Sequence, residues 1–220
     1  MANEQREFWS AVARKYDRVV DLQIGPKTRA MVRERVARET GLGRLAEFGC
    51  GTGFYTGVLA QTADSVVATD LSPGMLAVAK GRITAANVTF QTEDCQETSL
   101  PDGAFDTAFV GLVMHFTEPD RTLAEMRRIL KPGGTLIIAN PDPLALSVLA
   151  RVRFLVRAVY HALTGYRMRP PKGFGRNMLT EEQLCARLGQ AGFKVVSTET
   201  LRDTSRSSSI PIEYVRSVKL

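Results

Sequence analysis

Hydrophobic positions at the start of the chain repeat with the spacing of helices. In residues 4–21 and 27–40 apolar side chains recur at i, i+3 and i+4, which predicts two amphipathic helices. The Gly25-Pro26 pair separates them, because neither residue favours the interior of a helix. We therefore expect the first 40 residues or so to be helical.

Further along, short apolar runs alternate with helical segments. The predicted strands are residues 44–49, 65–70, 88–92, 106–114, 135–139, 193–200 and 210–220. The predicted helices among them are residues 54–63, 72–86, 118–130 and 180–192. Strict alternation of strands and helices predicts an α/β fold, in which a parallel sheet carries helices on both faces. In such sheets a ligand lies beyond the carboxyl ends of the strands, near the point where the strand order reverses.

The connection after the first predicted strand is rich in glycine. Gly49, Gly51 and Gly53 precede a helix, so a ligand can lie against bare backbone beside amide groups at a helix start. A phosphate-binding P-loop needs a Lys-Ser/Thr pair at that helix start, which this chain lacks. A dinucleotide-binding loop has a third glycine where this chain has Phe54. The spacing therefore indicates a third type of glycine loop.

An acidic residue stands at the end of the second predicted strand. Asp70 follows Gly53 by 17 residues, near the offset of about 20 at which a carboxylate binds a ribose. Such a carboxylate can accept hydrogen bonds from both hydroxyls of a diol. An NAD-binding protein would carry the same acid, so Asp70 does not by itself distinguish the ligands.

Several stretches, taken in order, resemble the class I S-adenosylmethionine-dependent methyltransferases. The resemblance is to the broad subfamily of methyltransferase type 11, which includes the ubiquinone/menaquinone methyltransferases, and it runs from about Tyr16 to Phe193. The similar stretches are KYD at 15–17, EFGCGTG at 47–53, VVATDLSPGML at 66–76, TEDCQETSLPDGAFD at 92–106, DTAFVGLVMHF at 106–116 and MRRILKPGGTLIIA at 126–139.

This resemblance implies an architecture. We expect a Rossmann-like, seven-stranded, mostly parallel sheet with helices on both faces. A single domain of residues 1–220 would include an N-terminal helical cap at 1–40. A basic helical insertion, or lid, would follow the fifth strand at 141–178.

The same resemblance implies S-adenosylmethionine as cofactor, with S-adenosylhomocysteine as product. The first motif would cradle the methionyl part, and Tyr16 would close over its amino-acid end. Asp70 would take the ribose hydroxyls, Asp94 would accept from the adenine amine, and the backbone at Cys95 would meet the ring. The candidate cofactor-binding residues are Tyr16, Glu47, Gly49, Cys50, Gly51, Gly53, Asp70, Leu71, Met75, Asp94, Cys95 and Val110.

The candidate catalytic residue is His115, one of two histidines in the chain. Methyl transfer from a sulfonium is an in-line displacement, so an enzyme chiefly holds the acceptor in place and excludes water. A base also helps where the acceptor is a phenol or an amine. His115 follows the fourth predicted strand, where it acts as a base, positions the substrate or serves only the loop structure.

The basic charge of the chain is concentrated in one segment. The whole chain carries +6, and the stretch from Pro141 to Arg176 holds seven basic residues against one acid, Asp142. Within it, residues 144–165 project as a helix with an apolar stripe. That stripe either packs on the core or forms a lid over an apolar acceptor, with the basic residues facing an anionic group or an anionic membrane. Phe8, Trp9 and Tyr16 would supply a facing aromatic wall.

The rest of the composition bears on the cellular location and the partners of the protein. Three cysteines without a CxxC pair indicate neither a disulfide framework nor a metal site. Together with the lack of a signal-peptide layout and of an apolar run of about 18 residues, they predict a cytoplasmic protein. The local basic excess differs from the spread basic face of a nucleic-acid binder, so we expect no nucleic-acid partner. The oligomeric state is not predicted.

Three hypotheses remain at this stage. The first is an enzyme that methylates a small, apolar or aromatic molecule. The second is a peripheral membrane enzyme that methylates a phospholipid or a quinone. The third is a cofactor-binding module without catalysis, or a modifier of nucleic acids. The chain lacks the Asn/Asp-Pro-Pro-Tyr/Phe motif of enzymes that methylate the amino groups of DNA bases.

Overall fold

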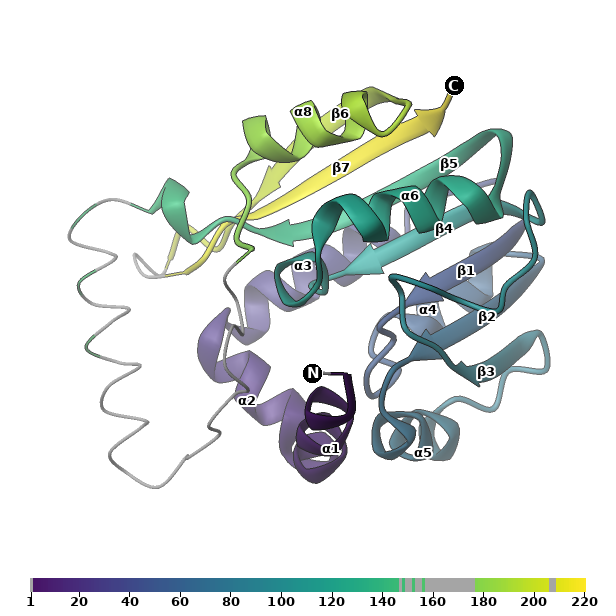
Figure 1. Cartoon of the computed structure of the whole chain (residues 1–220). Coiled ribbons are helices and arrows are strands. Elements are labelled where there is room, and N and C mark those ends of the chain that lie inside the picture. The colour runs from purple at the N-terminus through teal and green to yellow at the C-terminus, as the bar shows by residue number, and fades with distance from the viewer. Residues whose placement is uncertain (1, 147, 149–151, 153–155, 157–176, 206–208) are drawn as a thin grey trace.

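The fold is built on one seven-stranded sheet, seen in a computed structural model that describes residues 2–146, 148, 152, 156, 177–205 and 209–220 (Figure 1). The sheet has the order β3-β2-β1-β4-β5-β7-β6. Its strands are β1 (Arg44–Phe48), β2 (Ser65–Asp70), β3 (Val88–Thr92), β4 (Phe105–Gly111), β5 (Leu130–Pro141), β6 (Phe193–Leu201) and β7 (Ile212–Lys219). The strands β1 to β5 pair with one another in parallel, and β7 runs antiparallel to β5 and β6. The predicted α/β class and mostly parallel sheet are confirmed.

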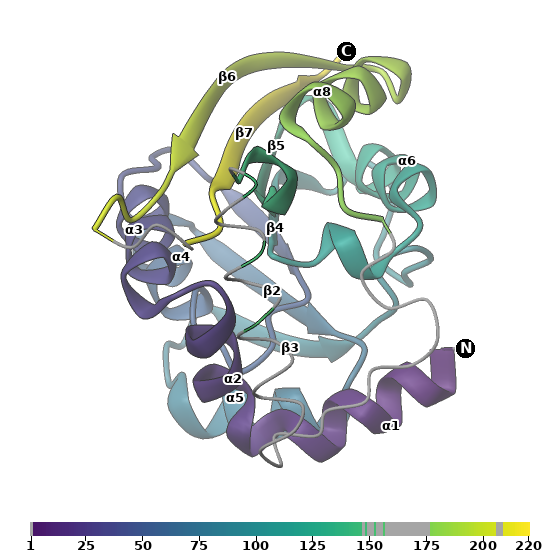
Figure 2. The same cartoon turned by 90° about the vertical axis from the view of Figure 1, so that its left-hand side faces the viewer.

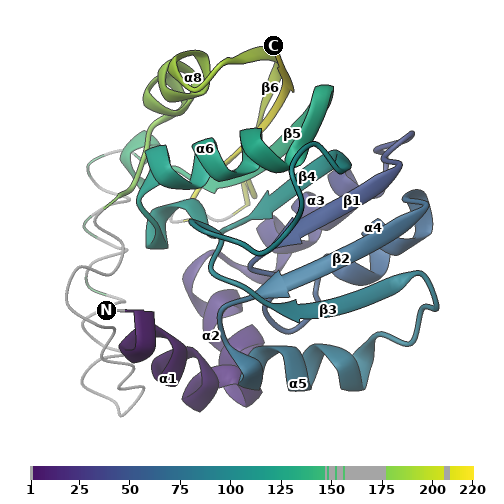
Figure 3. The same cartoon turned by 45° about the vertical axis from the view of Figure 1, so that its right-hand side comes forward.

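Helices cover both faces of this sheet (Figures 1 and 3). They are α1 (Ala2–Val12), α2 (Tyr16–Gln23), α3 (Pro26–Val36), α4 (Thr56–Thr62), α5 (Pro73–Arg82), α6 (Pro119–Ile129) and α8 (Glu181–Gln190). Short 3-10 turns lie at η1 (Ala13–Lys15), η2 (Met114–Phe116) and η3 (Pro143–Ala145). One core joins α3, α4 and α5 to a face of the sheet, and a second core joins α6 and α8 to the other.

The two cores follow from the alternation of side chains along each strand. In β1, Leu45 belongs to one core and Ala46 to the other, and all but the first residue of the strand are buried. In β5, Ile137 and its neighbour Ile138 divide in the same way, and both are 0% exposed. Burial on both faces is what turns such strands into nearly continuous apolar runs.

The point where the strand order reverses lies between β1 and β4. The chain leaves β1 for β2 on one side, whereas β4 pairs with β1 on the other. The glycine-rich segment follows β1 directly, so it opens at the carboxyl edge of the sheet. This is the place where open α/β sheets bind ligands.

The N-terminal helices, α1 and α2, lie across this carboxyl edge, with α1 beside α5 (Figures 2 and 3). The contact between α1 and α5 is close, because a Cβ atom at Gly74 would lie 2.8 Å from the Cα atom of Ser10. The hydroxyls of Ser10 and Ser72 are hydrogen-bonded at 2.8 Å. The absence of a side chain at Gly74 therefore lets α1 approach the end of β2.

Several element boundaries differ from the predictions, among them the end of the helix predicted over 27–40, which is at Val36, and the end of the strand predicted over 106–114, which is at Gly111. The first predicted helix is interrupted at η1, so α1 and α2 are separate segments. The helix predicted over 72–86 ends at Arg82, because Ile83 is extended. The fifth strand begins at Leu130 rather than at residue 135, because Leu130 already pairs with Phe105 across a register shift.

Most of the basic insertion lies outside the described residues. Of the predicted apolar stripe, the described residues include Val148, Val152 and Val156, whose side chains are 77%, 51% and 63% exposed. At these three positions the stripe does not pack on the core. The division of the chain into one domain with a cap and a lid stays a prediction.

Candidate functional site

The three loop glycines have backbone conformations that L side chains rarely adopt. Their φ angles are +62° at Gly49, +55° at Gly51 and +83° at Gly53. A Cβ atom at Gly49 would lie 2.3 Å from Cγ2 of Val113, and one at Gly51 would lie 3.4 Å from the ring of Tyr16. The loop thus needs glycine both for its conformation and for the close approach of its neighbours.

Asp70, at the end of β2, is held in a fixed orientation by this loop. One carboxylate oxygen accepts a hydrogen bond from the backbone N–H of Gly51 at 2.8 Å, and the other accepts from Ser72 at 2.9 Å. Burial raises the pKa of Asp70 to about 6, although these backbone hydrogen bonds oppose the shift. A buried carboxylate at a strand end, with its oxygens directed by amides, suits a ligand that donates hydroxyl hydrogen bonds.

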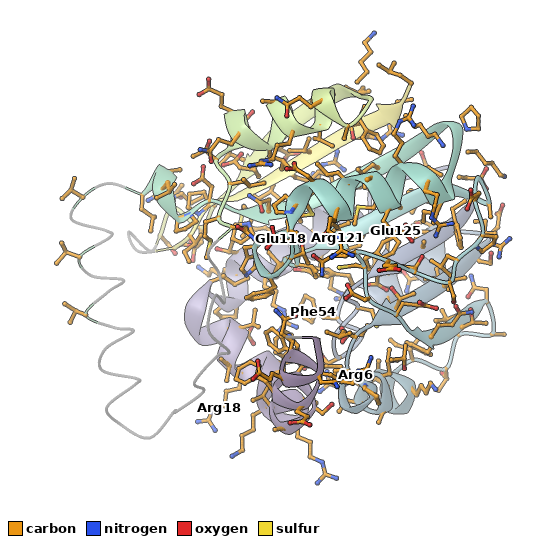
Figure 4. All side chains as sticks on the ribbon, viewed as in Figure 1. Arg6, Arg18, Phe54, Glu118, Arg121 and Glu125 are labelled. Atoms are coloured by element: carbon orange, nitrogen blue, oxygen red, sulfur yellow. The ribbon has the colours of Figure 1, made fainter. Side chains whose placement is uncertain are left out.

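A third segment, the loop from Glu93 to Ser99, completes this side of the site. The Asp94 carboxylate accepts hydrogen bonds from the backbone and the side chain of Gln96, at 2.9 and 3.2 Å. The loop is tied to α6, since Thr98 donates to Glu125 from both its backbone and its hydroxyl. Figure 4 shows Glu118, Arg121 and Glu125 along this helix.

These segments surround a pocket that is open to solvent at the carboxyl edge of the sheet. Of the residues predicted from sequence, it is lined by Tyr16, Gly49, Gly51, Asp70, Leu71, Met75, Asp94 and Cys95. Cys50 lines a smaller pocket that shares Tyr16, Gly49 and Gly51 with the first. Glu47, Gly53 and Val110 line neither of the two.

The cavity has further walls that the sequence analysis did not identify as binding residues. They are Gln5, Trp9, Glu93, Gln96, Leu112, Val113, Phe116 and Thr117. Trp9 was expected only as part of an aromatic wall. Leu112 has a φ angle of +62°, an unusual conformation for a residue with a side chain. No local pattern in the sequence reports that conformation, and α1 joins the wall only through tertiary packing.

His115 does not reach the cavity wall. Its side chain is 8% exposed, its ring centroid is 3.7 Å from that of Phe116, and Nδ1 has no hydrogen-bond partner among the described residues. Burial lowers the pKa of His115 to about 3, so the imidazole is neutral near pH 7. The placement gives no direct contact with a ligand in the cavity, and the catalytic role stays a prediction.

Arg29 is a cation that the sequence analysis missed. Its side chain is 3% exposed and pairs with Asp17 at 2.5 Å and with Asp21 at 3.2 Å. It lines the smaller pocket beside the glycine loop, and its Nε atom has no hydrogen-bond partner among the described residues. Arg29 shares a buried face of α3 with Val32 and Val36, and an arginine on an otherwise apolar stripe is the signal that could have revealed it.

Comparison with known proteins points to methyltransferases. A family model described as a methyltransferase domain matches residues 46–138, the span from β1 to β5. A malonyl-[acyl-carrier protein] O-methyltransferase from Paenibacillus sp. (strain JDR-2) is 27% identical over 98% of this chain and 79% of that protein. Together with the fold, these matches support a class I S-adenosylmethionine-dependent methyltransferase.

Other comparisons agree with the family. A demethylmenaquinone methyltransferase from Paenarthrobacter aurescens is 34% identical over 63% of the chain, and the match spans 55% of that protein. The structure of a DhpI–SAH complex has a TM-score of 0.72 and 22% identity, with coverage of 99% of this chain and 96% of that one. The chain thus spans about half the length of the quinone-pathway relative, and at this identity the solved structure shows a shared fold.

The residues present fit the cofactor of this family, S-adenosylmethionine. The backbone at Gly49 and Gly51 is open to the cavity, and Asp70 can accept from a diol. The pKa of the Arg29 guanidinium is raised, because ion pairs with Asp17 and Asp21 outweigh the effect of burial. A retained cation beside the glycine loop suits a carboxylate.

In the described part of the chain, no helix combines the length and apolar character needed to cross a membrane. Among those same residues, no group of three or more His, Cys, Asp or Glu side chains could hold a metal ion.

Glu47 lies below the glycine loop, 1% exposed, where it accepts a hydrogen bond from Thr56 at 2.6 Å. Burial raises the pKa of Glu47 from 4.5 to about 8; the Thr56 bond opposes the shift and the charge of Asp70 adds to it. The folded state holds this proton more tightly than the unfolded state does. The free energy of unfolding therefore falls as pH rises from 4.5 to about 8. We expect Glu47→Gln to raise the free energy of unfolding at pH 8 by on the order of 1–3 kcal/mol, with little effect at pH 4.5.

Urea unfolding of the protein without ligand at the two pH values measures this effect. Glu125→Gln is the matched control, because there burial is outweighed by hydrogen bonds from Arg128 and Thr98, which lower the pKa of Glu125 to about 2. That variant should lose stability at pH 8. A Glu47→Gln variant that is less stable than wild type at pH 8 would contradict the assignment.

Proposed function

We propose that this chain transfers the methyl group of S-adenosylmethionine to a small acceptor that is apolar or aromatic. The observation that carries the proposal is the make-up of the cavity. The glycine loop and the carboxylates at strand ends line it together with the apolar and aromatic side chains of Trp9, Phe116, Leu112 and Val113. A polar cofactor and an apolar acceptor can thus share one pocket.

The cofactor roles follow from the chemistry of each residue. Gly49 and Gly51 would admit the methionyl part, and Arg29 would pair with its carboxylate. Asp70 would accept from the ribose hydroxyls. Asp94 would accept from the adenine amine, with the backbone at Cys95 against the ring. The other candidates, Tyr16, Leu71 and Met75, supply cavity wall around these polar contacts.

When bound, the cofactor supplies an electrophilic methyl group on a positively charged sulfur. The task of the chain is to hold the acceptor in line with that group and to exclude water. Trp9 is central to the aromatic side, because its ring centroid lies 5.0 Å from Phe8, 5.8 Å from Tyr16 and 5.1 Å from Phe116. These edge-on contacts pack the indole among three other rings at the cavity wall.

Trp9→Ala is expected to raise KM for the acceptor by about tenfold, while the affinity for S-adenosylhomocysteine changes by less than about threefold. The reason is that the indole lines the cavity wall but is not among the groups proposed to hold the cofactor. Steady-state kinetics and calorimetric titration measure the two quantities. Phe8→Ala is a control, since the Phe8 ring contacts Trp9 and does not line the cavity. Equal losses of acceptor and cofactor affinity in Trp9→Ala would contradict a role of Trp9 in binding the acceptor.

The test of the proposed function is a partition of label. The protein is incubated with methyl-labelled S-adenosylmethionine and extract of its source cells, and label is counted in organic, aqueous and acid-precipitated fractions. Label in the organic phase is the expected result. Label in the aqueous phase would mean a polar metabolite, and label in the precipitate would mean a macromolecular acceptor. No transfer, with S-adenosylhomocysteine still bound, would favour a binding module without catalysis.

A second candidate is a peripheral membrane enzyme that methylates a phospholipid or quinone. The observation favouring it is the exposure of Val148, Val152 and Val156, spaced by four residues within the most basic part of the sequence. It predicts sedimentation of the protein with anionic vesicles at low salt and release at high salt. Failure to bind such vesicles at low salt would remove this candidate.

A further inference from the structure

Asp17 collects hydrogen bonds from three separate parts of the fold. Its Oδ1 atom accepts from Nη2 of Arg29 in α3 at 2.5 Å and from the hydroxyl of Thr52 in the glycine loop at 2.8 Å. Its Oδ2 atom accepts from Arg82 at the end of α5. Asp17 does not line either cavity, so direct ligand contact does not account for this convergence.

Each of these partners adjoins a cofactor-binding element. Asp17 follows Tyr16, whose ring is part of the cavity wall. Thr52 lies between two of the loop glycines and is 1% exposed. Arg82 also donates to the backbone carbonyl of Thr52 at 3.4 Å, so the loop is held through both its hydroxyl and its backbone.

Asp17 also fixes the orientation of Arg29. The Nη1 atom of Arg29 donates to the backbone carbonyl of Asp17 at 3.4 Å and to Asp21 at 3.2 Å. The guanidinium lies over the ring of Phe54, 3.7 Å from its centroid, and Figure 4 shows Phe54 on the inner side of the N-terminal helices. Without the Asp17 carboxylate, this buried cation would keep only the partly exposed Asp21 as a charged partner.

The Asp17 carboxylate keeps its charge in this setting. Burial alone would raise its pKa, but hydrogen bonds from Arg29, Arg82 and Thr52 outweigh that effect and lower the pKa below its ordinary value. Its side chain is 27% exposed, and those of its two arginine partners are 3% and 47% exposed. The network therefore runs from the surface to the buried side of the glycine loop.

We infer that Asp17 is a positioning residue, whose carboxylate holds the N-terminal helices, the glycine loop and Arg29 in the one arrangement that binds the cofactor. The inference rests on the proposed function for the identity of that ligand. It follows that cofactor affinity depends on a residue outside the cavity. It also follows that the N-terminal helices and the glycine loop order together when the cofactor binds.

The test is a double-mutant cycle on the binding of S-adenosylhomocysteine, measured by calorimetry on the full chain. We expect Asp17→Asn to raise Kd by about 10- to 100-fold and Thr52→Val by about 3- to 10-fold. Both changes act on the same hydrogen bond, since Asp17→Asn removes the charge of its acceptor and Thr52→Val removes its donor, so the double variant should bind more tightly than the product of the two factors predicts. Asp21→Asn is the matched control, since Asp21 contacts Arg29 but, among the described residues, forms no hydrogen bond with Thr52 or Arg82, and its Kd should rise less than threefold.

A second readout separates positioning from stability. Urea unfolding without ligand shows how much each variant is destabilised, and binding is then compared where all variants are folded. In wild type, S-adenosylhomocysteine should slow amide exchange in residues 2–23 as well as in the glycine loop. In Asp17→Asn that protection should be confined to the loop.

The outcomes distinguish this inference from the proposed function. A wild-type protein that does not bind S-adenosylhomocysteine would overturn the proposed function, and the inference with it. If wild type binds, an Asp17→Asn variant with unchanged Kd, or with the same Kd as Asp21→Asn, would overturn the inference alone. If the double variant raises Kd by the full product of the factors for Asp17→Asn and Thr52→Val, the role of Asp17 at the glycine loop is equally overturned.

Discussion

Replacing Asp70 by alanine is expected to weaken the binding of S-adenosylhomocysteine by about two to three orders of magnitude. Hydrogen bonds to charged groups contribute about 1.5–3 kcal/mol each, and the carboxylate would accept two from the ribose. The variant also removes the acceptor for the backbone amides of Gly51 and Ser72, which order the loop. Isothermal titration of the purified protein gives the change in Kd.

Asp106→Ala is the control for this variant. Asp106 is also an aspartate of a parallel strand, where it accepts from Lys131 at 2.6 Å and from the backbone of Arg44 at 2.9 Å. It lies toward the amino edge of the sheet, away from the cavity, so its loss should lower stability and leave Kd within about twofold. If Asp70→Ala and Asp106→Ala changed Kd by similar factors, the assignment of Asp70 to the ribose would be contradicted.

The binding of wild type should also depend on pH. Since the ribose hydroxyls need the ionised form of Asp70, and burial raises its pKa to about 6, affinity should fall as pH drops through 6. This sign is opposite to the effect of Glu47 on stability, so the two titrations can be told apart in the same pH series.

Gly49→Ala is the second change with a large expected effect. Alanine there would adopt a φ angle of +62° and place its Cβ atom 2.3 Å from Val113. We expect a loss of about 2–4 kcal/mol in the free energy of unfolding, together with at least a hundredfold loss of cofactor affinity. Urea unfolding and calorimetric titration measure the two losses.

Gly103→Ala separates the two causes. Gly103 has a φ angle of +55°, yet a Cβ atom there would meet nothing within 4 Å. That variant carries only the conformational cost of about 1–2 kcal/mol and should bind the cofactor normally. Adding Val113→Ala to Gly49→Ala should recover part of the lost stability. Equal losses for Gly49→Ala and Gly103→Ala would show that the overlap with Val113 is relieved at no cost.

The sequence was sufficient for those parts of the fold that depend on local periodicity. Alternating apolar runs and helical segments predicted the sheet, and the glycine spacing placed the loop after β1, where the strand order reverses. The motif-based candidates that line the cavity lie on those same elements. Their shared feature is that strand ends and turns are encoded by neighbouring residues.

The rest depends on contacts between distant segments. Trp9 and Phe116 are 107 positions apart, and only the docking of α1 brings their rings together. Arg29 is one of four basic residues in α3, and nothing in the neighbouring sequence shows that Asp17 and Asp21 pair with it. Leu130 joins β5 through a register shift with Phe105, which no strand propensity reports.

The close contact at Gly74 sets how near α1 lies to α5, and so places the part of the cavity wall that Gln5 and Trp9 supply. The sheet supplies the polar wall, while the distance at which α1 sits is set by how much room position 74 leaves for Ser10. A larger residue there would push α1, with Gln5 and Trp9, away from the end of β2. During divergence or directed evolution, one codon could therefore alter the room that the cavity leaves for an acceptor.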